Sequence, residues 1–288
     1  MRSTWDCLLE NVGEWRGSFA QVDSQGQWLQ DNPSITHLRA IDGGKTIDQR
    51  VQQFAPTPDG QFPDPDHAPL VKDLHLTYSS VGQGFLALET GAFSQGSMQL
   101  GPFSEFGAEL GLVARPRRLR VVIRYDKDAQ LMPISLIREG LHPDTAPGNR
   151  NQLSPADLLA ALPGTWEGQS YTVYPDWQPA TEGESRLEIQ RSGDRLTQVL
   201  QFGDRSIRSE ARIVGDRLEF TAGNVTVLLM ADGASATFPT ELKFRQPLFL
   251  EAGWLIEPNL RQRLIRRYDD RGAWQSLTLV IERRVAEG

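Results

Sequence analysis

Hydrophobic and polar residues alternate along a series of short runs in the second half of the chain. These runs occupy residues 185–191, 195–202, 206–214, 217–221, 224–231 and 274–284. Alternation with a period of two predicts half-buried β-strands, whose successive side chains point to opposite faces. The breaks between runs are rich in Gly, Asp and Asn, which tolerate the positive φ of tight connections, so we expect antiparallel hairpins.

A long series of consecutive antiparallel strands would have two unpaired edge strands if it formed an open sheet. About seven or eight strands of this kind in a row would leave exposed backbone hydrogen-bonding groups at the two ends of an open sheet. Closure into a barrel removes those edges. An up-and-down barrel is therefore the predicted architecture of this half.

Two sequence signatures occur twice, in the same order. Gly13–Phe19 reads GEWRGSF and Gly164–Tyr171 reads GTWEGQSY, so that Gly-x-Trp-x-Gly is followed by an aromatic residue in each. Further along, Glu109–Asp126 and Glu251–Asp269 share Glu, Gly, Pro, Arg and a final Arg-Tyr-Asp. Two separate signatures that recur in the same order indicate a tandem duplication.

Each copy begins with the signals of a short helix. Ser3 and Ser154 are suited to cap a helix, each is followed three residues later by Asp, and each segment stops at a glycine. A short helix, a Gly-x-Trp and an antiparallel meander resemble the lipocalin/calycin plan, in which the tryptophan closes one end of the barrel. The resemblance implies this structural role for Trp15 and Trp166 and an interior wide enough for one small ligand.

The predicted fold class is all-β, with two tandem lipocalin/calycin-like antiparallel up-and-down β-barrels, each preceded by a short helix. We expect an N-terminal barrel over residues 1–142, a linker over 143–153 and a C-terminal barrel over 154–288, packed against each other. The linker assignment follows from the Pro, Gly, Asn and Asp residues of that stretch. Ala55–Pro69 contains five prolines, which exclude a central strand and predict a long loop.

Composition narrows the classes of partner and compartment. The net charge is −7, which argues against nucleic acid because non-specific affinity for it requires a basic surface. There is one cysteine, so no internal disulfide can form and a reducing compartment is expected. No apolar stretch has the length of a membrane span. We therefore expect a cytoplasmic protein without a membrane span.

Catalytic motifs are absent from the sequence. It has no Gly-x-Ser-x-Gly, no P-loop, no Gly-x-Gly-x-x-Gly after a strand and no Cys or His pair at metal-ligand spacing. We predict no catalytic and no metal-binding residues. A binding protein is favoured over an enzyme.

The strand at Glu251–Asp269 carries an unusual concentration of arginine. Arg261, Arg263 and Arg267 share one face, and Leu260, Leu264 and Tyr268 share the other. One interpretation places the aliphatic face in the barrel and the arginines in water. The other turns the arginines toward the cup, where guanidinium groups could pair with carboxylates of a ligand or of neighbours such as Glu251.

This stretch resembles the signature of the S/U-type bilin lyases, which attach bilins to phycobiliproteins. The matching residues are Glu251, Trp254, Pro258, Asn259, Leu260, Arg261 and Arg263, followed by Gly272, Ser276, Glu282 and Arg283. The whole chain more closely resembles a family of cyanobacterial tandem calycin-like proteins of unknown function. The lyase resemblance implies a ligand-binding set made of Arg261, Arg263, Trp254 and Glu251.

The first copy departs from this pattern. Leu112 stands where the second copy has Trp254, and Arg117-Arg118 stand where Asn259-Leu260 would be. We therefore expect the first cup to lack the site.

The leading functional hypothesis is binding of an amphipathic, anionic, bilin- or tetrapyrrole-like molecule in the C-terminal barrel. The protein would act as a carrier or as a bilin lyase, with a phycobiliprotein-like acceptor supplying the thiol. One alternative is a non-catalytic binder of a lipid or carotenoid. Another is a protein-interaction or assembly module whose barrels are filled with side chains.

Overall fold

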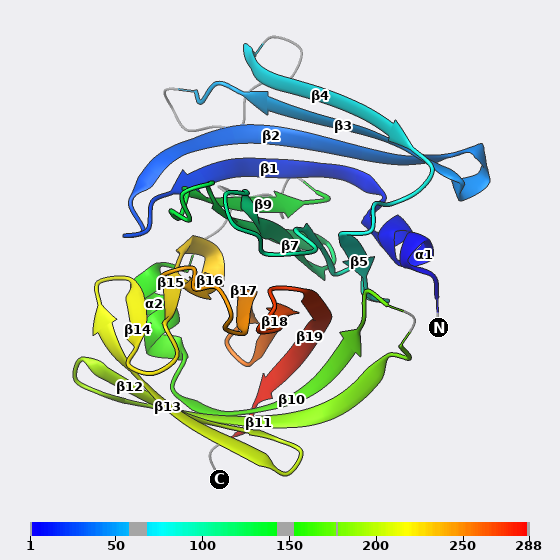
Figure 1. Cartoon of the computed structure of the whole chain (residues 1–288). Coiled ribbons are helices and arrows are strands. Elements are labelled where there is room, and N and C mark those ends of the chain that lie inside the picture. Colours follow the sequence, from blue (N-terminus) through cyan, green and yellow to red (C-terminus); the bar gives the residue numbers. More distant parts are fainter. Residues whose placement is uncertain (1, 58–67, 143–152, 177, 287–288) are drawn as a thin grey trace.

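The chain forms two β-sheets with little helix, as the sequence predicts. The computed structural model describes residues 2–57, 68–142, 153–176 and 178–286. The predicted linker lies almost entirely outside the described residues, as does most of the predicted loop Ala55–Pro69. One sheet uses the first half of the chain and the other the second half (Figure 1). The all-β prediction with two related units is confirmed.

The first half begins with α1 (Thr4–Leu8) and η1 (Leu9–Asn11) and folds into a curled, nine-stranded sheet. Its strand order is β4-β3-β2-β1-β9-β8-β7-β6-β5. The strands are β1 (Gly13–Val22), β2 (Trp28–Ile41), β3 (Thr46–Phe54), β4 (Leu70–Tyr78), β5 (Phe85–Ala87), β6 (Phe93–Gly96), β7 (Phe106–Ala114), β8 (Arg117–Tyr125) and β9 (Ile134–Gly140), with η2 (Asp42–Gly44) between β2 and β3. This sheet is a half-barrel, because β4 and β5 are not paired with each other.

The second half closes into the predicted up-and-down barrel. Its ten strands follow one another in chain order, and β10 pairs with β19 to close the ring. The elements are α2 (Pro155–Ala161), β10 (Gly164–Val173), β11 (Thr181–Ser192), β12 (Arg195–Phe202), β13 (Arg205–Val214), β14 (Arg217–Phe220), β15 (Val225–Leu229), η3 (Ala231–Gly233), β16 (Ala234–Pro239), β17 (Leu248–Glu257), β18 (Leu260–Tyr268) and β19 (Trp274–Arg284).

Both helices start in the way that the sequence predicts. The Ser3 hydroxyl accepts a hydrogen bond from the Asp6 backbone N–H at 3.1 Å, and the Asp6 carboxylate accepts one from the Ser3 backbone N–H at 3.3 Å. Ser154 and Asp157 form the same reciprocal pair at the same two distances. These capping boxes satisfy backbone donors that the first helical turn leaves free.

A tryptophan and an arginine seal the helix-covered end of each sheet. Trp15 and Trp166 are fully buried, and their indole N–H groups donate to the carbonyl oxygens of Asn11 and Leu162 at 2.8 and 3.0 Å. The structural role predicted for both tryptophans is confirmed.

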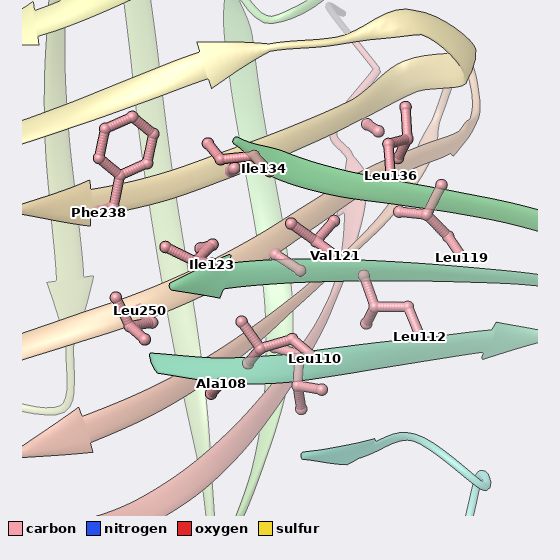
Figure 2. Packing of buried hydrophobic residues seen from close by; sticks show 14 of the residues in the cluster. Ala108, Leu110, Leu112, Leu119, Val121, Ile123, Ile134, Leu136, Phe238 and Leu250 are labelled. Atoms are coloured by element: carbon pink, nitrogen blue, oxygen red, sulfur yellow. The ribbon is translucent and has the colours of Figure 1, made fainter. Parts of the chain in front are cut away.

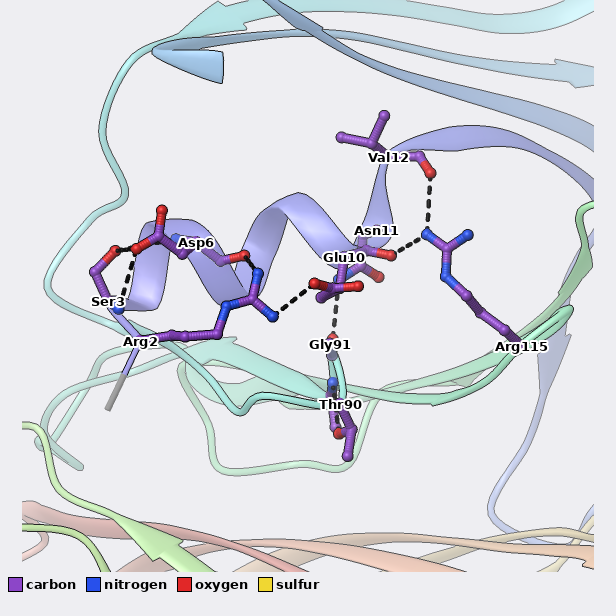
Figure 3. A network of polar contacts seen from close by, with 10 residues as sticks. Arg2, Ser3, Asp6, Glu10, Asn11, Val12, Thr90, Gly91 and Arg115 are labelled. Carbon is purple, nitrogen blue, oxygen red and sulfur yellow. Dashed lines mark hydrogen bonds and ion pairs between the residues drawn. The ribbon is translucent and has the colours of Figure 1, made fainter. Parts of the chain in front are cut away.

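The arginine that completes this seal comes from the end of β19 in the second half and from the β7–β8 turn in the first. Arg284, at the end of β19, lies 4.3 Å from the Trp166 ring centroid and donates to the carbonyl oxygens of Ala161 and Pro163. In the first half, Arg115 from the β7–β8 turn donates to Glu10 and Val12 carbonyls beside α1 (Figure 3).

The largest apolar core lies between the two halves rather than inside either one. Strands β7, β8 and β9 present aliphatic side chains to the outer wall of the closed barrel (Figure 2). Members from the first half include Leu110, Leu112, Leu119, Val121, Ile123 and Leu136, and members from the second include Phe238, Leu250, Ala252, Leu264, Leu277 and Leu279. Burial of so many apolar side chains is the main contribution to holding the halves together.

Two tyrosines fix this interface in matching ways. The Tyr125 hydroxyl donates to the Pro239 carbonyl oxygen at 2.5 Å, and the Tyr268 hydroxyl donates to the Ser97 carbonyl oxygen at 2.9 Å. Each bond crosses from one half to the other. Each buried hydroxyl therefore has a hydrogen-bond acceptor, and neither is left unpaired.

Candidate binding site

The two faces of β18 point to different environments, which decides between the two interpretations of its arginines. Arg261 lies 4.7 Å from the ring centroid of Trp166, inside the closed barrel. Leu264, Arg266 and Tyr268, on the other face, contact the first half; Arg266 donates to the carbonyl oxygens of Gly84 and Ser97 at 3.1 and 3.0 Å. The arginine face therefore turns into the barrel interior, called the lumen below, and the aliphatic face turns to the neighbouring sheet.

Arg261 and Arg263 converge on one buried carboxylate from β19. Glu282 is fully buried and accepts from Arg261 Nε at 2.5 Å and from Arg263 Nε and Nη2 at 3.2 Å each. Arg263 Nη1 also donates to Glu251 on β17 at 3.4 Å. These four residues, Glu251, Arg261, Arg263 and Glu282, are called the C-terminal quartet.

The two carboxylates of the quartet have opposite pKa shifts. Burial alone would raise the pKa of Glu282, but the charges of Arg263 and Arg261 and their hydrogen bonds lower it to about 2. Burial raises the pKa of Glu251, with a further increase from the nearby charge of Glu282, and the single long bond from Arg263 does not reverse it. Glu282 is therefore ionised at neutral pH, whereas Glu251 is the carboxylate that takes up a proton most readily.

One rung of the sheet brings two unpartnered atoms to the quartet. Ser185, Gly168, Glu282 and Arg261 are consecutive register partners across β11, β10, β19 and β18. The Ser185 hydroxyl and Arg261 Nη2 are buried and have no hydrogen-bond partner. A Cβ on Gly168 would lie 2.7 Å from the Ser185 hydroxyl and 2.8 Å from Glu282 Cγ, so only glycine lets these side chains approach.

The outer part of the lumen wall carries two exposed apolar side chains. Phe202 on β12 and Ile207 on β13 have the alternation of the lumen-facing residues Leu196 and Ala211, yet they are 46% and 57% exposed. In the quartet, the side chains of Arg263 and Glu251 keep 17% and 11% exposure. The lumen thus has a charged floor, still reachable from solvent, below an apolar rim.

The half-barrel contains a second quartet with the same connections, called the N-terminal quartet. Glu139 accepts from Arg118 Nε at 2.8 Å and from Arg120 Nε and Nη2 at 3.0 Å each, and Arg120 Nη1 donates to Glu109 at 2.8 Å. Arg118 lies 4.4 Å from the Trp15 ring centroid, as Arg261 lies over Trp166. The charged residues of the site therefore occur in both copies, and the expectation that the first cup lacks a binding site stays a prediction.

The matching rung of the half-barrel also leaves the same two kinds of atom unpartnered. Ser34, Gly17, Glu139 and Arg118 are register partners across β2, β1, β9 and β8. The Ser34 hydroxyl and Arg118 Nη2 are buried without a hydrogen-bond partner. The second copy has one extra residue before its arginines. Arg118 is therefore the residue equivalent to Arg261.

The structure brings together three of the four predicted ligand-binding residues. Arg261, Arg263 and Glu251 meet in the lumen. Trp254 lies on the opposite face of β17, in the core between the halves, where the guanidinium carbon of Arg117 is 5.1 Å from its ring centroid. Trp254 is therefore separated from the other three by the barrel wall.

Sequence reasoning missed Glu282 and the whole N-terminal quartet as members of a site. The duplication carried the signal: Arg120 and Arg263 are 143 positions apart, and the same offset links Glu139 to Glu282 and Arg118 to Arg261. Glu282 belongs to the lyase-like sequence stretch but not to the predicted ligand-binding set.

The described residues give little evidence for metal binding or for a reactive thiol. Within these ranges, no group of three or more His, Cys, Asp or Glu residues is arranged to hold a metal ion. Cys7 is a buried free thiol beside α1, and burial raises its pKa, which disfavours the reactive thiolate. In the same ranges, no helix is long and apolar enough to cross a membrane.

A closed up-and-down barrel with a charged lumen floor, joined to a half-barrel of the same plan, defines a tandem calycin-type protein. The chain belongs to the DUF3598 family. It is 41% identical to a DUF3598-family protein of unknown function from Nostoc punctiforme; the match covers 99% of this chain and 100% of that one, with a TM-score of 0.86. The predicted membership in a tandem calycin family is confirmed.

Two family descriptions match the separate halves. "Domain of unknown function (DUF3598), N-terminal" matches residues 1–143, and "Biogenesis factor required for ATP synthase 1, C-terminal domain" matches residues 150–285. No curated protein matches the sequence.

More distant solved structures are similar to the chain at low identity. An S-type phycobiliprotein lyase from Guillardia theta is 13% identical, with a TM-score of 0.38, over 47% of this chain and 94% of that one. A putative outer membrane protein from Bacteroides fragilis is 11% identical, with a TM-score of 0.29, over 96% of this chain and 99% of that one.

Proposed function

We propose that the C-terminal barrel binds an amphipathic, anionic small molecule, with bilin-type tetrapyrroles as the class to test first. The observation that carries the proposal is the charged lumen floor under an apolar rim. Arg263 and Glu251 are reachable from the mouth, and Arg261 keeps a donor without a partner. An amphipathic molecule could place its acidic group on the floor and its apolar rings against Phe202 and Ile207.

The charge of the floor depends on Glu251. With both carboxylates ionised, the C-terminal quartet is neutral. Protonation of Glu251, whose pKa is raised by burial, gives the quartet a net charge of about +1. We expect affinity for an anionic ligand to rise as the pH falls toward the pKa of Glu251, because binding favours the protonated form.

The lumen wall is lined by small residues on one side of the quartet. The lumen-facing positions of β10 and β11 near the quartet are Gly168, Ser170, Gly183 and Ser185. These residues project little side chain, unlike the leucines and isoleucine that fill the helix-covered end. A Cβ on Gly168 would lie 2.7 Å from the Ser185 hydroxyl, and one on Gly183 would lie 3.1 Å from the Ser170 hydroxyl, so these small residues let the side chains around the quartet pack closely.

A carrier or lyase-like role would need no nucleophile from the lumen. The chain has one cysteine, and it is buried in the first half. In a bilin transfer, an acceptor protein would supply the thiol, and the barrel would hold the bilin in a productive orientation and shield it from water. The sequence resemblance of the β17–β18 stretch to bilin lyases supports this version.

The test is a titration of the purified protein with phycocyanobilin, followed by visible absorption. We expect a saturable spectral shift that is weakened at least tenfold by Arg263→Gln and by Phe202→Ser. The matched control is Arg120→Gln, which removes the equivalent arginine from the half-barrel and should leave the shift unchanged. Circular dichroism checks that each variant is folded.

Two outcomes would contradict the proposal. An unchanged spectrum at saturating pigment would exclude the tetrapyrrole, and equal binding by the wild type, Phe202→Ser and Arg263→Gln would exclude the lumen as the site. Because Phe202 is exposed, its substitution tests the lumen without the risk of unfolding that accompanies the buried arginines.

A second candidate is an assembly factor that binds a protein. The match of residues 150–285 to the C-terminal domain of a biogenesis factor required for ATP synthase favours it. Native mass spectrometry of the protein purified from its source separates the candidates, because a retained pigment adds a small defined mass and an assembly partner adds the mass of a polypeptide.

A further inference from the structure

The outer face of the half-barrel carries a hollow that is lined by ionisable side chains. Its volume is about 430 Å³, and its walls are formed by His37, Arg39, Asp48, Arg50, Asp73 and His75. These residues belong to β2, β3 and β4, which lie on the side of the half-barrel away from the closed barrel (Figure 1). The hollow is therefore separate from the lumen that contains the C-terminal quartet.

Strand pairing places the two histidines of the hollow on either side of an arginine. His37, Arg50 and His75 are consecutive register partners across β2, β3 and β4. Their side chains point away from the half-barrel interior, because the next rung, with Thr36 and Val51, pairs with the buried Trp15. Neighbouring strands are about 4.8 Å apart, so the three ionisable side chains form one row.

Both carboxylates of the hollow already have partners. Asp73 accepts from Arg50 Nε at 2.9 Å and from Arg50 Nη2 at 2.6 Å, and Asp48 Oδ1 lies 2.5 Å from His75 Nε2. The hydrogen bonds from Arg50 and His75 lower the pKa of the Asp73 and Asp48 carboxyls. Both carboxylates are therefore ionised at neutral pH, and their charge is paired within the hollow.

Arg39 borders the same hollow without such a pairing. Among the described residues, its guanidinium makes no hydrogen bond and no ion pair. His37, on the same strand, uses one ring nitrogen for a contact of 3.4 Å between Nδ1 and Glu14. Arg39 therefore brings to the hollow several N–H donors and a positive charge that no carboxylate offsets by direct contact in the described chain.

The equivalent row of the closed barrel has a different composition. There, Glu188, Val199 and Arg208 are consecutive partners across β11, β12 and β13. Thr165 begins this row and Glu14 begins the row of the half-barrel, each directly before the buried tryptophan. Exposed ion pairs contribute little to stability. The shared barrel plan therefore does not require the histidines and the Arg–Asp pair of the first half.

We propose that the hollow binds an oxyanionic group of the phosphate class. Arg39 would hold the group through two parallel N–H donors, the geometry in which a guanidinium recognises phosphate. His37 and His75 would add positive charge beside it when they are protonated. A cation is disfavoured because it would meet Arg39 and Arg50, and an apolar ligand would meet ionisable side chains.

Binding should depend on pH through the histidines. At neutral pH the two arginines and two carboxylates of the hollow have no net charge, and each protonated histidine adds one positive charge. Burial lowers the pKa of His37, and the charge of Glu14 only opposes this effect. The charged groups that face the two rings are Glu14, Arg16, Arg39, Asp48, Arg50 and Asp73. Affinity should rise as the pH falls below the ordinary histidine value of about 6.5, because an anion favours the protonated ring.

The test is a titration of the full-length protein, labelled with ¹³C-histidine, with sodium sulfate at constant ionic strength. Sulfate carries the same charge at pH 6 and pH 8, so a difference between these conditions reports on the protein. The chain has four histidines, and His37→Gln and His75→Gln identify the two resonances of the hollow. We expect these two to shift with half-saturation below about 10 mM at pH 6, and at least threefold weaker binding at pH 8.

Arg39→Gln should weaken sulfate binding at least tenfold, because it removes the guanidinium that has no other partner. The matched control is Arg208→Gln, which removes an exposed arginine from the equivalent row of the closed barrel. This control should bind sulfate within twofold of the wild type. Arg39 is exposed, so its substitution tests the site with little risk of unfolding, and circular dichroism checks the fold.

Two further arms identify the source of the phosphate group. The first repeats the histidine titration with inorganic phosphate at pH 6. The second measures co-sedimentation with phosphatidylcholine vesicles, with and without phosphatidic acid. A response to free phosphate alone would assign a soluble ligand, and binding that requires phosphatidic acid and is lost in Arg39→Gln would assign a lipid headgroup.

Three results would overturn the proposal. The first is the absence of both a saturable histidine shift up to about 50 mM anion and vesicle binding. The second is equal binding by the wild type and Arg39→Gln. The third is an equal response to sodium chloride at the same ionic strength, which would assign the shifts to screening. None of these results depends on pigment binding by the C-terminal barrel.

Discussion

The two halves contain the same charged quartet on equivalent strands, yet one sheet closes and the other does not. The Glu282 and Glu139 carboxylates accept the same set of guanidinium donors, atom by atom. Among the described residues, the closed sheet has one strand, β14, without a counterpart in the first half. The quartets therefore link three equivalent strands in each half: β7, β8 and β9 in the first, and β17, β18 and β19 in the second.

The differences between the halves then indicate what each could bind. The second half has a closed lumen with an apolar rim and an acidic group of raised pKa, which suits an amphipathic anion. The first half is open between β4 and β5 and carries the exposed residues Leu74 and Leu76 on β4.

Removing the central carboxylate of either quartet should give the largest effect. Glu282→Gln and Glu139→Gln each leave two buried arginines without their main acceptor, so each should lower the free energy of unfolding by about 3–5 kcal/mol. Denaturant unfolding measures both. The control is Glu210→Gln, which breaks an exposed ion pair with Arg195 and should cost less than about 1 kcal/mol. If only one of these two variants lowered the free energy of unfolding by this amount, the two quartets would not be equivalent.

The shared core should respond equally from its two sides. Leu110→Ala and Leu264→Ala each remove a fully buried side chain between the halves, and each should cost about 2–5 kcal/mol. Because this core belongs to both sheets, calorimetry should show one unfolding transition for the wild type. Two separate transitions in the wild type would contradict a shared core.

Acid should destabilise both halves over the same pH range. The pKa of Glu139, which burial would raise, is lowered to about 2 by Arg118 and Arg120, and that of Glu282 is lowered to about 2 by its own arginines. A lowered pKa contributes stability that is complete above the unfolded value of about 4.3 and is lost as the pH falls toward 2. Each site should contribute about 3 kcal/mol over this range.

Urea unfolding between pH 5 and pH 2.5 tests this dependence. Each Gln variant should lose its share of it, and the double variant Glu139→Gln/Glu282→Gln should lose both. An undiminished pH dependence in the double variant would assign acid sensitivity to other carboxylates.

The helix caps should give the smallest and most closely matched effects. Ser3→Ala and Ser154→Ala each remove a hydroxyl that accepts from the first helical turn, at a cost of about 1 kcal/mol. Thermal unfolding of the two variants measures the effect. A clear difference between them would show that one helix contributes more to sealing its sheet.

The sequence predicted the parts of the fold that depend on local chemistry. Turn residues located the hairpins of the second half, Ser-Asp spacing located both helix caps, and Gly-x-Trp located both sealed ends. Period-two alternation also assigned Arg261 and Arg263 to one face of β18. Each of these features depends on residues close together in the sequence.

The orientation of that face could not be predicted from alternation alone. An aliphatic face seeks burial, and here the neighbouring sheet buries it, so the arginines are left to the lumen. The partner surface comes from residues more than 100 positions away, such as Leu119 and Val121. The open side of the first half was missed because it reflects a short connection between Tyr78 and Ala87, not a change in residue pattern.

The two tyrosine bonds between the halves have a consequence for the origin of the chain. Tyr125 and Tyr268 are 143 positions apart, and their acceptors Ser97 and Pro239 are 142 apart, so each tyrosine reaches the counterpart of the other's acceptor. This exchange is the relation that a two-fold axis creates at an isologous interface. The halves meet as the two subunits of a symmetric homodimer would, which is the arrangement expected if an ancestral single-barrel protein dimerised through this wall before its gene was duplicated and fused.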